Sequence, residues 1–178
     1  MRLKLNALLI AVAVAATPTL AAERPICAPQ SVVLTGKAAV ERNLKTVGAI
    51  YEAFGKGNVP GILGCISPKA KWESWGGNSA QRAGVPWMKE QHGSDGVAAF
   101  FAYIGKWKVN GFAVKNVMAS GANVAAEVEV DFEVTQTGGR IQDEELHYWT
   151  FDERGRVTGL RHYSDTAEHI AAFRGKQN

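Results

Sequence analysis

Two histidines near the C-terminal end of the sequence, His147 and His162, are the residue types best suited to chemistry. An imidazole takes up or releases a proton near neutral pH, whereas a carboxylate needs a large pKa shift to do so. The residues Asp152–Gly155 between them predict a hairpin turn, which would place their two strands side by side. The pair could therefore move protons to and from a small molecule. The alternative for each histidine is a hydrogen-bonded place in a pocket wall or on the solvent face.

Side chains that share a strand face with His147 extend this candidate site. Because side chains alternate along a strand, Glu145, His147 and Trp149 would point the same way, and Glu145 could orient an imidazole. A β-bulge would exchange the two faces, so the register stays open. We expect an apolar pocket for a ring-bearing ligand, with Tyr51, Trp72, Glu145 and Trp149 in its walls. The alternative for each aromatic residue is ordinary core packing.

An acidic row on a long predicted strand supplies a third candidate, Asp131, as an orienting carboxylate. Apolar residues alternate with acids on this strand; the apolar face holds Val124, Ala126, Val128, Val130, Phe132 and Val134, and the acidic face holds Glu127, Glu129, Asp131 and Glu133. The competing interpretation, which the alternation favours, is a solvated outer face or the rim of a subunit contact.

Other polar residues are assigned to structure. Asp165 predicts an N-cap, and Glu168 stands at the capping-box spacing behind it. His169 falls in the first turn of the same helix and is expected to face solvent. His92 lies in a long loop, where it could act as part of a lid or simply be solvated.

The sequence lacks the common cofactor motifs. No pair of histidines or cysteines stands at a metal-binding spacing, and there is no nucleophile elbow, phosphate loop or dinucleotide fingerprint. We therefore expect neither a metal nor another cofactor.

Hydrophobic periodicity predicts the elements that must position these residues. Spacings of three and four predict a first helix over residues 40–54, a short second helix after Asn58 that ends at Ser67–Pro68, and a third helix after Ser94. A short strand is expected at residues 71–75, followed by a long loop over 76–93. After Asn110 the period changes to two, which predicts four antiparallel strands at residues 112–119, 122–135, 141–151 and 157–164, before a final helix. This order indicates an α+β domain.

The N-terminus has the layout of a secretory signal peptide. Basic residues Arg2 and Lys4 precede the apolar run ALLIAVAVAA at residues 7–16, and small residues follow up to residue 22. The run is too short to span a bilayer, although an N-terminal membrane anchor is the alternative. We expect residues 1–22 to be a signal peptide, 23–37 an extended lead-in and 38–174 the domain, with a periplasmic or secreted location and no membrane span after cleavage.

The charge of the sequence bears on nucleic-acid binding, and its cysteine content bears on disulfide formation. Without Arg2 and Lys4 the 20 basic residues fall to 18 against 17 acids, so the formal charge of +3 becomes +1. With no dense basic run, nucleic acid is not expected as a partner. Cys27 and Cys65 are the only cysteines; in an oxidising compartment they can form a disulfide, and the alternative is two separate buried thiols.

Three local patterns resemble the SnoaL-like branch of the nuclear transport factor 2-like superfamily, over about residues 40–173. They are VGAIYEAFGKGNVPGIL, GSDGVAAFFAYI and YWTFDERGRVTGLRHYSDTAEHIAAF. The resemblance implies a cone: a strongly curved antiparallel sheet folded over three N-terminal helices, with a short C-terminal helix. The pocket of this cone serves isomerases, cyclases, hydratases, epoxide hydrolases and binding domains, so the fold does not fix the function.

The resemblance also implies roles for single residues. Trp72 and Ser74 stand at places similar to those where short first strands of the superfamily carry a pocket tyrosine or asparagine. His162 stands where epoxide hydrolases and polyketide cyclases of the superfamily carry an acid–base carboxylate. Glu145-Leu146-His147 is similar to the Gln-x-His pair of SnoaL-like cyclases, with Glu in place of Gln. Asp131 matches the aspartate of an Arg-x-Asp pair, but Glu129 replaces the arginine. Without that arginine the water-activating relay is incomplete, which argues against epoxide hydrolysis.

The sequence thus predicts an exported domain with an apolar small-molecule pocket. Its predicted function is that of a cofactor-free acid–base enzyme of isomerase, cyclase or hydratase type. In it, one histidine would abstract a proton and the other would polarise an oxygen. We expect a homodimer formed through the sheet. The alternatives are a non-catalytic ligand-binding or protein-association module of the cell envelope, and a structural domain whose cone is filled.

Overall fold

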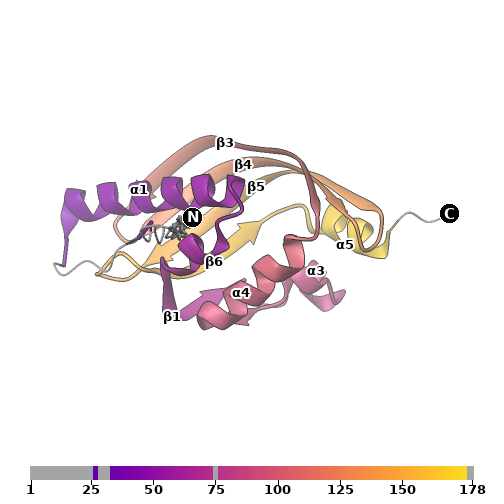
Figure 1. The fold of residues 1–178 in the computed structure, drawn as a ribbon, viewed down its shortest axis with the longest axis horizontal. Coiled ribbons are helices and arrows are strands. Elements are labelled where there is room, and N and C mark those ends of the chain that lie inside the picture. Colours follow the sequence, from indigo (N-terminus) through magenta and orange to yellow (C-terminus); the bar gives the residue numbers. More distant parts are fainter. Residues whose placement is uncertain (1–25, 28–32, 74–75, 176–178) are drawn as a thin grey trace, which may run out of the picture.

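One curved six-stranded sheet folds over the helices in the computed structural model, which describes residues 26–27, 33–73 and 76–175 (Figure 1). The element order is α1 (Gly36–Gly55), α2 (Val59–Leu63), β1 (Ile66–Trp72), α3 (Ser79–Arg82), a 3₁₀ turn η1 (Pro86–Met88), β2 (Gln91–His92), α4 (Gly93–Ile104), β3 (Lys108–Ser120), β4 (Asn123–Val134), β5 (Gly139–Phe151), β6 (Val157–Tyr163) and α5 (Thr166–Arg174). The α+β cone expected from the sequence is confirmed. The expected signal peptide, residues 1–22, lies outside the described residues.

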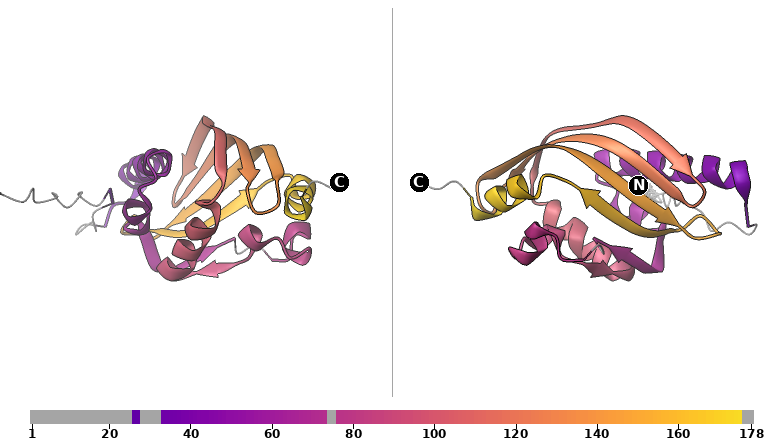
Figure 2. Two further views of the ribbon diagram at one scale, coloured as in Figure 1. Left: turned by 45° about the vertical axis from the view of Figure 1, so that its right-hand side comes forward. Right: turned by 180° about the vertical axis from the view of Figure 1, so that it is seen from behind.

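The sheet runs in the order β2-β1-β6-β5-β4-β3. Strands β3 to β6 form the expected antiparallel meander, whereas β1 joins its last strand β6 in parallel. The views in Figure 2 show how this sheet bends around the inner side of the molecule. Helix α1 lies against β3 and β4, α4 against β1, and α5 against β5, so helices surround the concave face.

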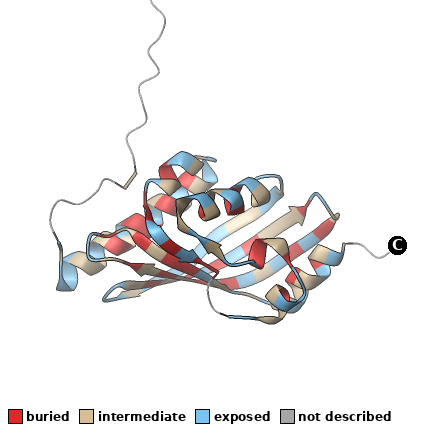
Figure 3. Cartoon of the chain, turned by 90° about the horizontal axis from the view of Figure 1, so that it is seen from below, coloured by how far each residue is buried: buried red, intermediate tan, exposed pale blue. Residues whose placement is uncertain are grey.

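Period-two alternation sets which face of β4 is inward. The apolar residues of its inward row are buried on the concave side, except Phe132, which is half-buried, while Glu127 and Glu129 are exposed on the convex side. Figure 3 shows the same change between buried and exposed residues along the strands. The strand carries one inward and one outward row because successive side chains point to opposite faces.

The segment around β1 differs from the sequence expectation. Strand β1 begins at Ile66, so Ser67–Pro68 lies inside the strand and α2 has already ended at Leu63. Its pairing with β6 is interrupted between Ile66 and Lys71, and proline is tolerated in such irregular stretches because no ladder hydrogen bond is needed there. The expected loop over 76–93 also contains α3, the 3₁₀ turn and β2.

The start of α5 also differs in part from expectation. Asp165 caps the helix, because its Oδ1 accepts the backbone N–H groups of Ala167 and Glu168. Glu168 does not complete a capping box. Its carboxylate instead accepts the backbone N–H of Gln142 on β5, and the Asp165 N–H donates to Asp143. The helix is therefore fastened to the sheet from both sides of its first turn.

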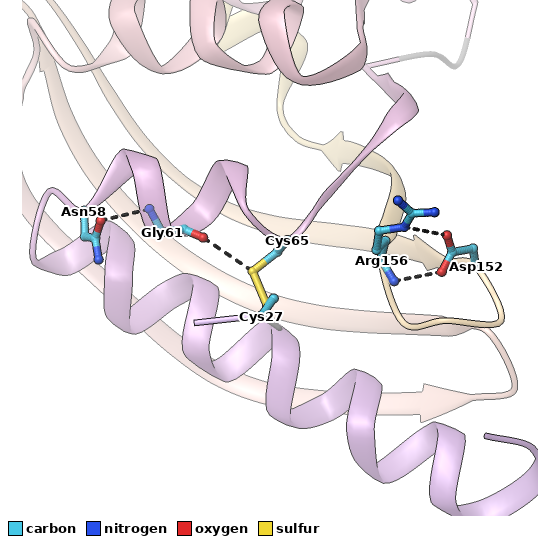
Figure 4. Close-up of a disulfide and its surroundings, with 6 residues drawn as sticks. All are labelled: Cys27, Asn58, Gly61, Cys65, Asp152 and Arg156. Carbon is cyan, nitrogen blue, oxygen red and sulfur yellow. Dashed lines mark hydrogen bonds and ion pairs between the residues drawn. A yellow bond between two sulfur atoms is a disulfide. The ribbon is translucent and has the colours of Figure 1, made fainter. Parts of the chain in front are cut away.

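A disulfide joins Cys27 to Cys65, at the junction between α2 and β1 (Figure 4). The two cysteines are 38 residues apart, and the loop between them contains the whole of α1. No helix within the described residues has the length and apolar character needed to cross a bilayer.

Removing this disulfide should destabilise the domain without altering the pocket. Closing a loop of 38 residues restricts the unfolded chain, and such a crosslink stabilises by about 2–4 kcal/mol. The double variant Cys27→Ser/Cys65→Ser should therefore lose about that much free energy of unfolding in a urea titration. Wild-type protein under reducing conditions should match the variant. An unchanged unfolding midpoint in both would show that the loop constraint contributes nothing.

Candidate functional site

A cavity of about 80 Å³ lies between the concave face of the sheet and the helices. Most of its wall is aromatic, and the rings come from α1, β1, η1, α4, the turn after α4, β3, β4 and β5. Its ionisable side chains within the described residues are Tyr51, Glu145, His147, His162 and His169. A few polar groups converging in an aromatic cavity are typical of a small-molecule site.

The two histidines singled out in the sequence meet in this cavity. In the antiparallel register of β5 and β6, His147 stands directly opposite His162, and their ring centroids are 4.4 Å apart in an edge-on arrangement. Glu145 and Trp149 lie on the same inward face of β5 as His147, and both contribute to the cavity wall. The only irregularity in this pairing falls between Thr150 and Phe151, beyond the site, so the inward face is kept.

His169 is a member of the site, which corrects the expectation that it faces solvent. It is 4% exposed, and its Nδ1 lies 2.8 Å from the indole Nε1 of Trp87. An indole N–H can only donate, so His169 Nδ1 must accept and the ring is neutral, with its proton on Nε2. That Nε2–H donates to Oε1 of Glu145 over 3.1 Å.

A second chain of hydrogen bonds reaches Glu145 from the opposite side. Trp149 Nε1–H donates to the Tyr51 hydroxyl (3.1 Å), which lies 3.0 Å from Nδ1 of His147. Burial raises the pKa of Tyr51, while burial and the neighbouring His162 lower the pKa of His147. Tyr51 therefore keeps its proton and donates it to a neutral His147. The Nε2–H of His147 then donates to Oε2 of Glu145 over 2.9 Å.

Glu145 is the centre on which these two chains converge, and each of its oxygens accepts one imidazole N–H. Burial by itself would raise the pKa of Glu145. The hydrogen bonds from His147 and His169 lower this pKa by more than burial raises it, so it lies well below the ordinary value. The carboxylate is ionised although it is only 6% exposed. Both oxygens of the Glu145 carboxylate thus have a hydrogen-bond donor, and the carboxylate holds the His147 and His169 rings in place.

A separate buried carboxylate, Glu73, holds His162. Glu73 is 0% exposed and hydrogen-bonds through Oε1 to Nδ1 of His162, while its Oε2 accepts the His162 backbone N–H. Burial lowers the pKa of His162, but the charge and hydrogen bond of Glu73 raise it more, so the pKa lies above the ordinary value. Nδ1 faces Glu73, and Nε2 of the same ring has no hydrogen-bond partner within the described residues.

Glu73 is the functional residue that sequence reasoning missed. Alternation along the expected strand 71–75 would send Trp72 inward and Glu73 outward, yet both are buried. The reason is a left-handed backbone at Glu73, with φ of 57°, which is uncommon outside glycine and turns the side chain inward. Its own N–H and C=O are held by Leu160 and Gln81. No sequence pattern marks such a conformation at a glutamate.

The remaining predicted residues divide between the cavity and other places. Tyr51 and Trp72 line the cavity, and Ser74 lies outside the described residues. Asp131 is corrected: it points to the convex face, where Arg140 binds it through two hydrogen bonds of 2.8 and 2.6 Å and lowers its pKa. The strict alternation of β4 puts it opposite to the cavity. His92 is exposed, and its Nε2 lies 3.5 Å from Oε1 of Glu90.

Two groups of side chains have the composition and spacing of metal ligands. Glu145, His147 and His162 each offer one ligand atom within 4.8 Å of the others, and so do Asp143, Glu145 and His169. No spacing in the sequence indicates the first group, because its ligands come from two strands that only the hairpin brings together.

Comparison with known proteins adds a family and a fold. The profile of the SnoaL-like domain matches residues 47–160. A nuclear transport factor 2-like protein of unknown function from Burkholderia pseudomallei is 25% identical, with a TM-score of 0.59 over 72% of this chain and 95% of that chain. No curated protein matches.

Two further solved structures share the fold at lower identity. A candidate isomerase from Bacillus subtilis is 18% identical, with a TM-score of 0.62 over 78% of this chain and 96% of that chain. A candidate SnoaL-like polyketide cyclase from Jannaschia sp. is 15% identical, with a TM-score of 0.60 over 81% of this chain and 99% of that chain.

Proposed function

Because the chain belongs to the SnoaL-like domain family of the nuclear transport factor 2-like superfamily, we propose that it is an acid–base enzyme of isomerase or cyclase type. Its substrate would be a small, ring-bearing molecule with a carbonyl group, and no cofactor would be needed for the proton transfer. The observation that carries the proposal is the Glu73–His162 pair: one imidazole nitrogen is held by a buried carboxylate, and the other belongs to an aromatic cavity.

In the proposed reaction, Nε2 of His162 takes a proton from the carbon next to the carbonyl. Glu73 stabilises the imidazolium that forms and holds the ring in place, which is the usual task of a carboxylate behind a catalytic histidine. The same nitrogen then returns the proton to another carbon of the resulting enolate. The bond shift is an isomerisation, or the first step of a ring closure, and no proton is gained or lost overall.

His147 supports the site rather than acting as the second proton-transfer group. Its Nδ1 is bonded to Tyr51 and its Nε2 to Glu145, so neither nitrogen is available to polarise a carbonyl oxygen. Two indole N–H groups of cavity-wall residues, Trp72 and Trp107, have no hydrogen-bond partner within the described part of the chain. They are the candidate donors for the oxygen of a ligand.

The proposal is tested by incubating the chain in D₂O with small β,γ-unsaturated and aryl ketones and following the protons next to the carbonyl by NMR. We expect exchange or double-bond migration faster than in a protein-free control. If several ketones bind but none exchanges, the chemistry is refuted and a second function stands: a non-catalytic binding module. That reading is supported by the Glu145 network, which satisfies its own members and leaves a single imidazole nitrogen for a ligand.

Export to the periplasm or the medium is part of the same proposal. Its support is the layout of residues 1–22 together with a disulfide, a bond that persists in oxidising compartments. N-terminal sequencing of the protein secreted by its own host would test the expected cleavage near Ala21 or Ala22.

A homodimer through the convex face of the sheet is the proposed assembly. Apolar side chains are exposed there between the charged residues; Leu146 is 37% exposed and stands opposite Tyr163 on β6, and Met118 lies on β3. Leu146→Glu should place a like charge beside Glu127 and Glu144 and shift the mass in light scattering from two chains to one. Val33→Glu, an exposed position outside the sheet, should leave the mass unchanged. A wild-type mass of one chain would refute the dimer.

A further inference from the structure

We propose that Glu145, His147 and His162 bind one divalent transition-metal ion of the Zn²⁺ class. This goes beyond the proposed acid–base function and does not depend on it. The three ligand atoms lie within 4.8 Å of one another, on the inward faces of the adjacent strands β5 and β6. Two imidazole nitrogens and one carboxylate oxygen form a donor set that suits zinc, cobalt, nickel or ferrous iron, and not the oxygen-preferring magnesium.

The spacing of two of the ligands already fits a metal. Nε2 of His147 and Oε2 of Glu145 are 2.9 Å apart. Two ligands that each lie about 2.1 Å from one ion are about 3.4 Å apart at the tetrahedral angle and about 3 Å apart at a right angle, so this pair would have to separate by at most about 0.5 Å. His162 supplies the third donor, because its Nε2 has no hydrogen-bond partner among the residues described. The proton now on Nε2 of His147 would have to move to Nδ1, where the Tyr51 oxygen can accept it.

Each prospective ligand is held by a second side chain from a different element. Glu73 binds Nδ1 of His162, Tyr51 binds Nδ1 of His147, and His169 binds the other oxygen of Glu145. Metal-binding histidines usually have such a partner on the nitrogen that does not contact the ion, because it fixes the ring and its protonation. These outer contacts are a second observation, independent of the spacing of the ligands.

The charge of the cavity points to a cation as well. Glu73 and Glu145 are two buried carboxylates, and no lysine or arginine contributes to the cavity wall in the described ranges. His169 is neutral because Trp87 donates to it, and His147 is neutral in the arrangement above. A protonated His162 would balance only one of the two carboxylates, whereas a divalent ion would balance both, and buried charges require such balance.

The ion and the proposed base exclude each other. Both use Nε2 of His162, so a bound ion should stop proton transfer by that nitrogen. Zinc would then be an inhibitor of the acid–base reaction, and its remaining coordination positions would face the aromatic cavity.

The test is calorimetric titration of the untagged, chelator-treated chain with ZnCl₂, and with MgCl₂ as the mismatched ion. We expect one Zn²⁺ per chain and no Mg²⁺ binding. His162→Gln and His147→Gln should abolish the site, and Glu73→Gln, which removes only an outer contact, should weaken it about 10–100-fold. His92→Gln is the matched control, because it removes an exposed histidine of the chain and should change nothing.

A readout on the wild type guards against variants that fail to fold. Co²⁺ bound to nitrogen and oxygen ligands should give visible absorption bands that Zn²⁺ abolishes. Absence of Zn²⁺ binding by the wild type, or binding that His162→Gln and His147→Gln leave unchanged, would overturn the proposal. Turnover is scored separately on chelator-treated protein: a chain that binds Zn²⁺ but exchanges no ketone proton refutes only the proposed function, and the reverse result refutes only the metal site.

Discussion

Replacing His162 by glutamine should lower the rate of proton transfer to a ketone substrate about 10²–10⁴-fold, the range that general acid–base catalysis contributes. Glutamine can still donate a hydrogen bond to Glu73, so the buried carboxylate is not left alone, but an amide cannot take up a proton. Ligand affinity should change much less than turnover, because the aromatic wall of the cavity is intact. The measurement is the NMR exchange rate in D₂O for the fully bound substrate.

Two companion variants sharpen this result. Glu73→Gln keeps the base but removes the charge that stabilises its protonated form, so its rate should fall between those of wild type and His162→Gln. His92→Gln should retain the wild-type rate, because His92 is exposed and forms no part of the cavity wall. Equal rates in wild type and His162→Gln would remove His162 from the reaction altogether.

Replacing Glu145 by leucine should lower the free energy of unfolding by about 2–6 kcal/mol, because each of two buried donors left without an acceptor costs about 1–3 kcal/mol. Two imidazole N–H groups, one from His147 and one from His169, would lose their acceptor inside an apolar region. Urea titration monitored by tryptophan fluorescence measures the change. A loss of less than 1 kcal/mol would show that water or another group satisfies both donors.

Glu145→Gln is the matched variant, and it should lower the free energy of unfolding by less than Glu145→Leu does. Trp87 fixes the proton of His169 on Nε2, so the amide oxygen must face His169 and the amide NH₂ must face His147. His147 can accept from the amide only by moving its proton to Nδ1, where the Tyr51 oxygen accepts it. Ring ¹⁵N shifts should therefore show His147 changing tautomer while His169 does not. A stability equal to that of Glu145→Leu, without the tautomer change, would contradict this account.

Periodicity predicted the parts of the fold that repeat. The alternation of β4 gave its inward face, and the hairpin at residues 152–155 gave the pairing that sets His147 opposite His162. Trp149 was assigned to the cavity from the same kind of alternation on β5. Such features depend on residues near each other in sequence, where spacing alone decides which side chains share a face.

The residues that sequence reasoning misplaced depend on single conformations or distant contacts. Glu73 turns inward through one left-handed backbone angle, which alternation cannot anticipate. His169 is buried because Trp87, 82 residues away in sequence, packs against it. Asp131 was assigned through a motif position despite the acidic row around it, and the row, not the motif, described its surroundings.

The parallel pairing of β1 with β6 ties the site to the final stage of folding. Glu73 directly follows β1, and its partner His162 lies on β6, 89 residues further along the chain. Contacts of such long range form slowly, because the entropy of closing the loop must be lost before the contact stabilises anything. The meander β3–β6 can form from segments that are neighbours in the sequence. His162 on β6 nevertheless lacks its partner Glu73 until β1 pairs with β6. A refolding chain should thus regain secondary structure before it regains activity, and a nascent chain should have none until residue 162 has been added.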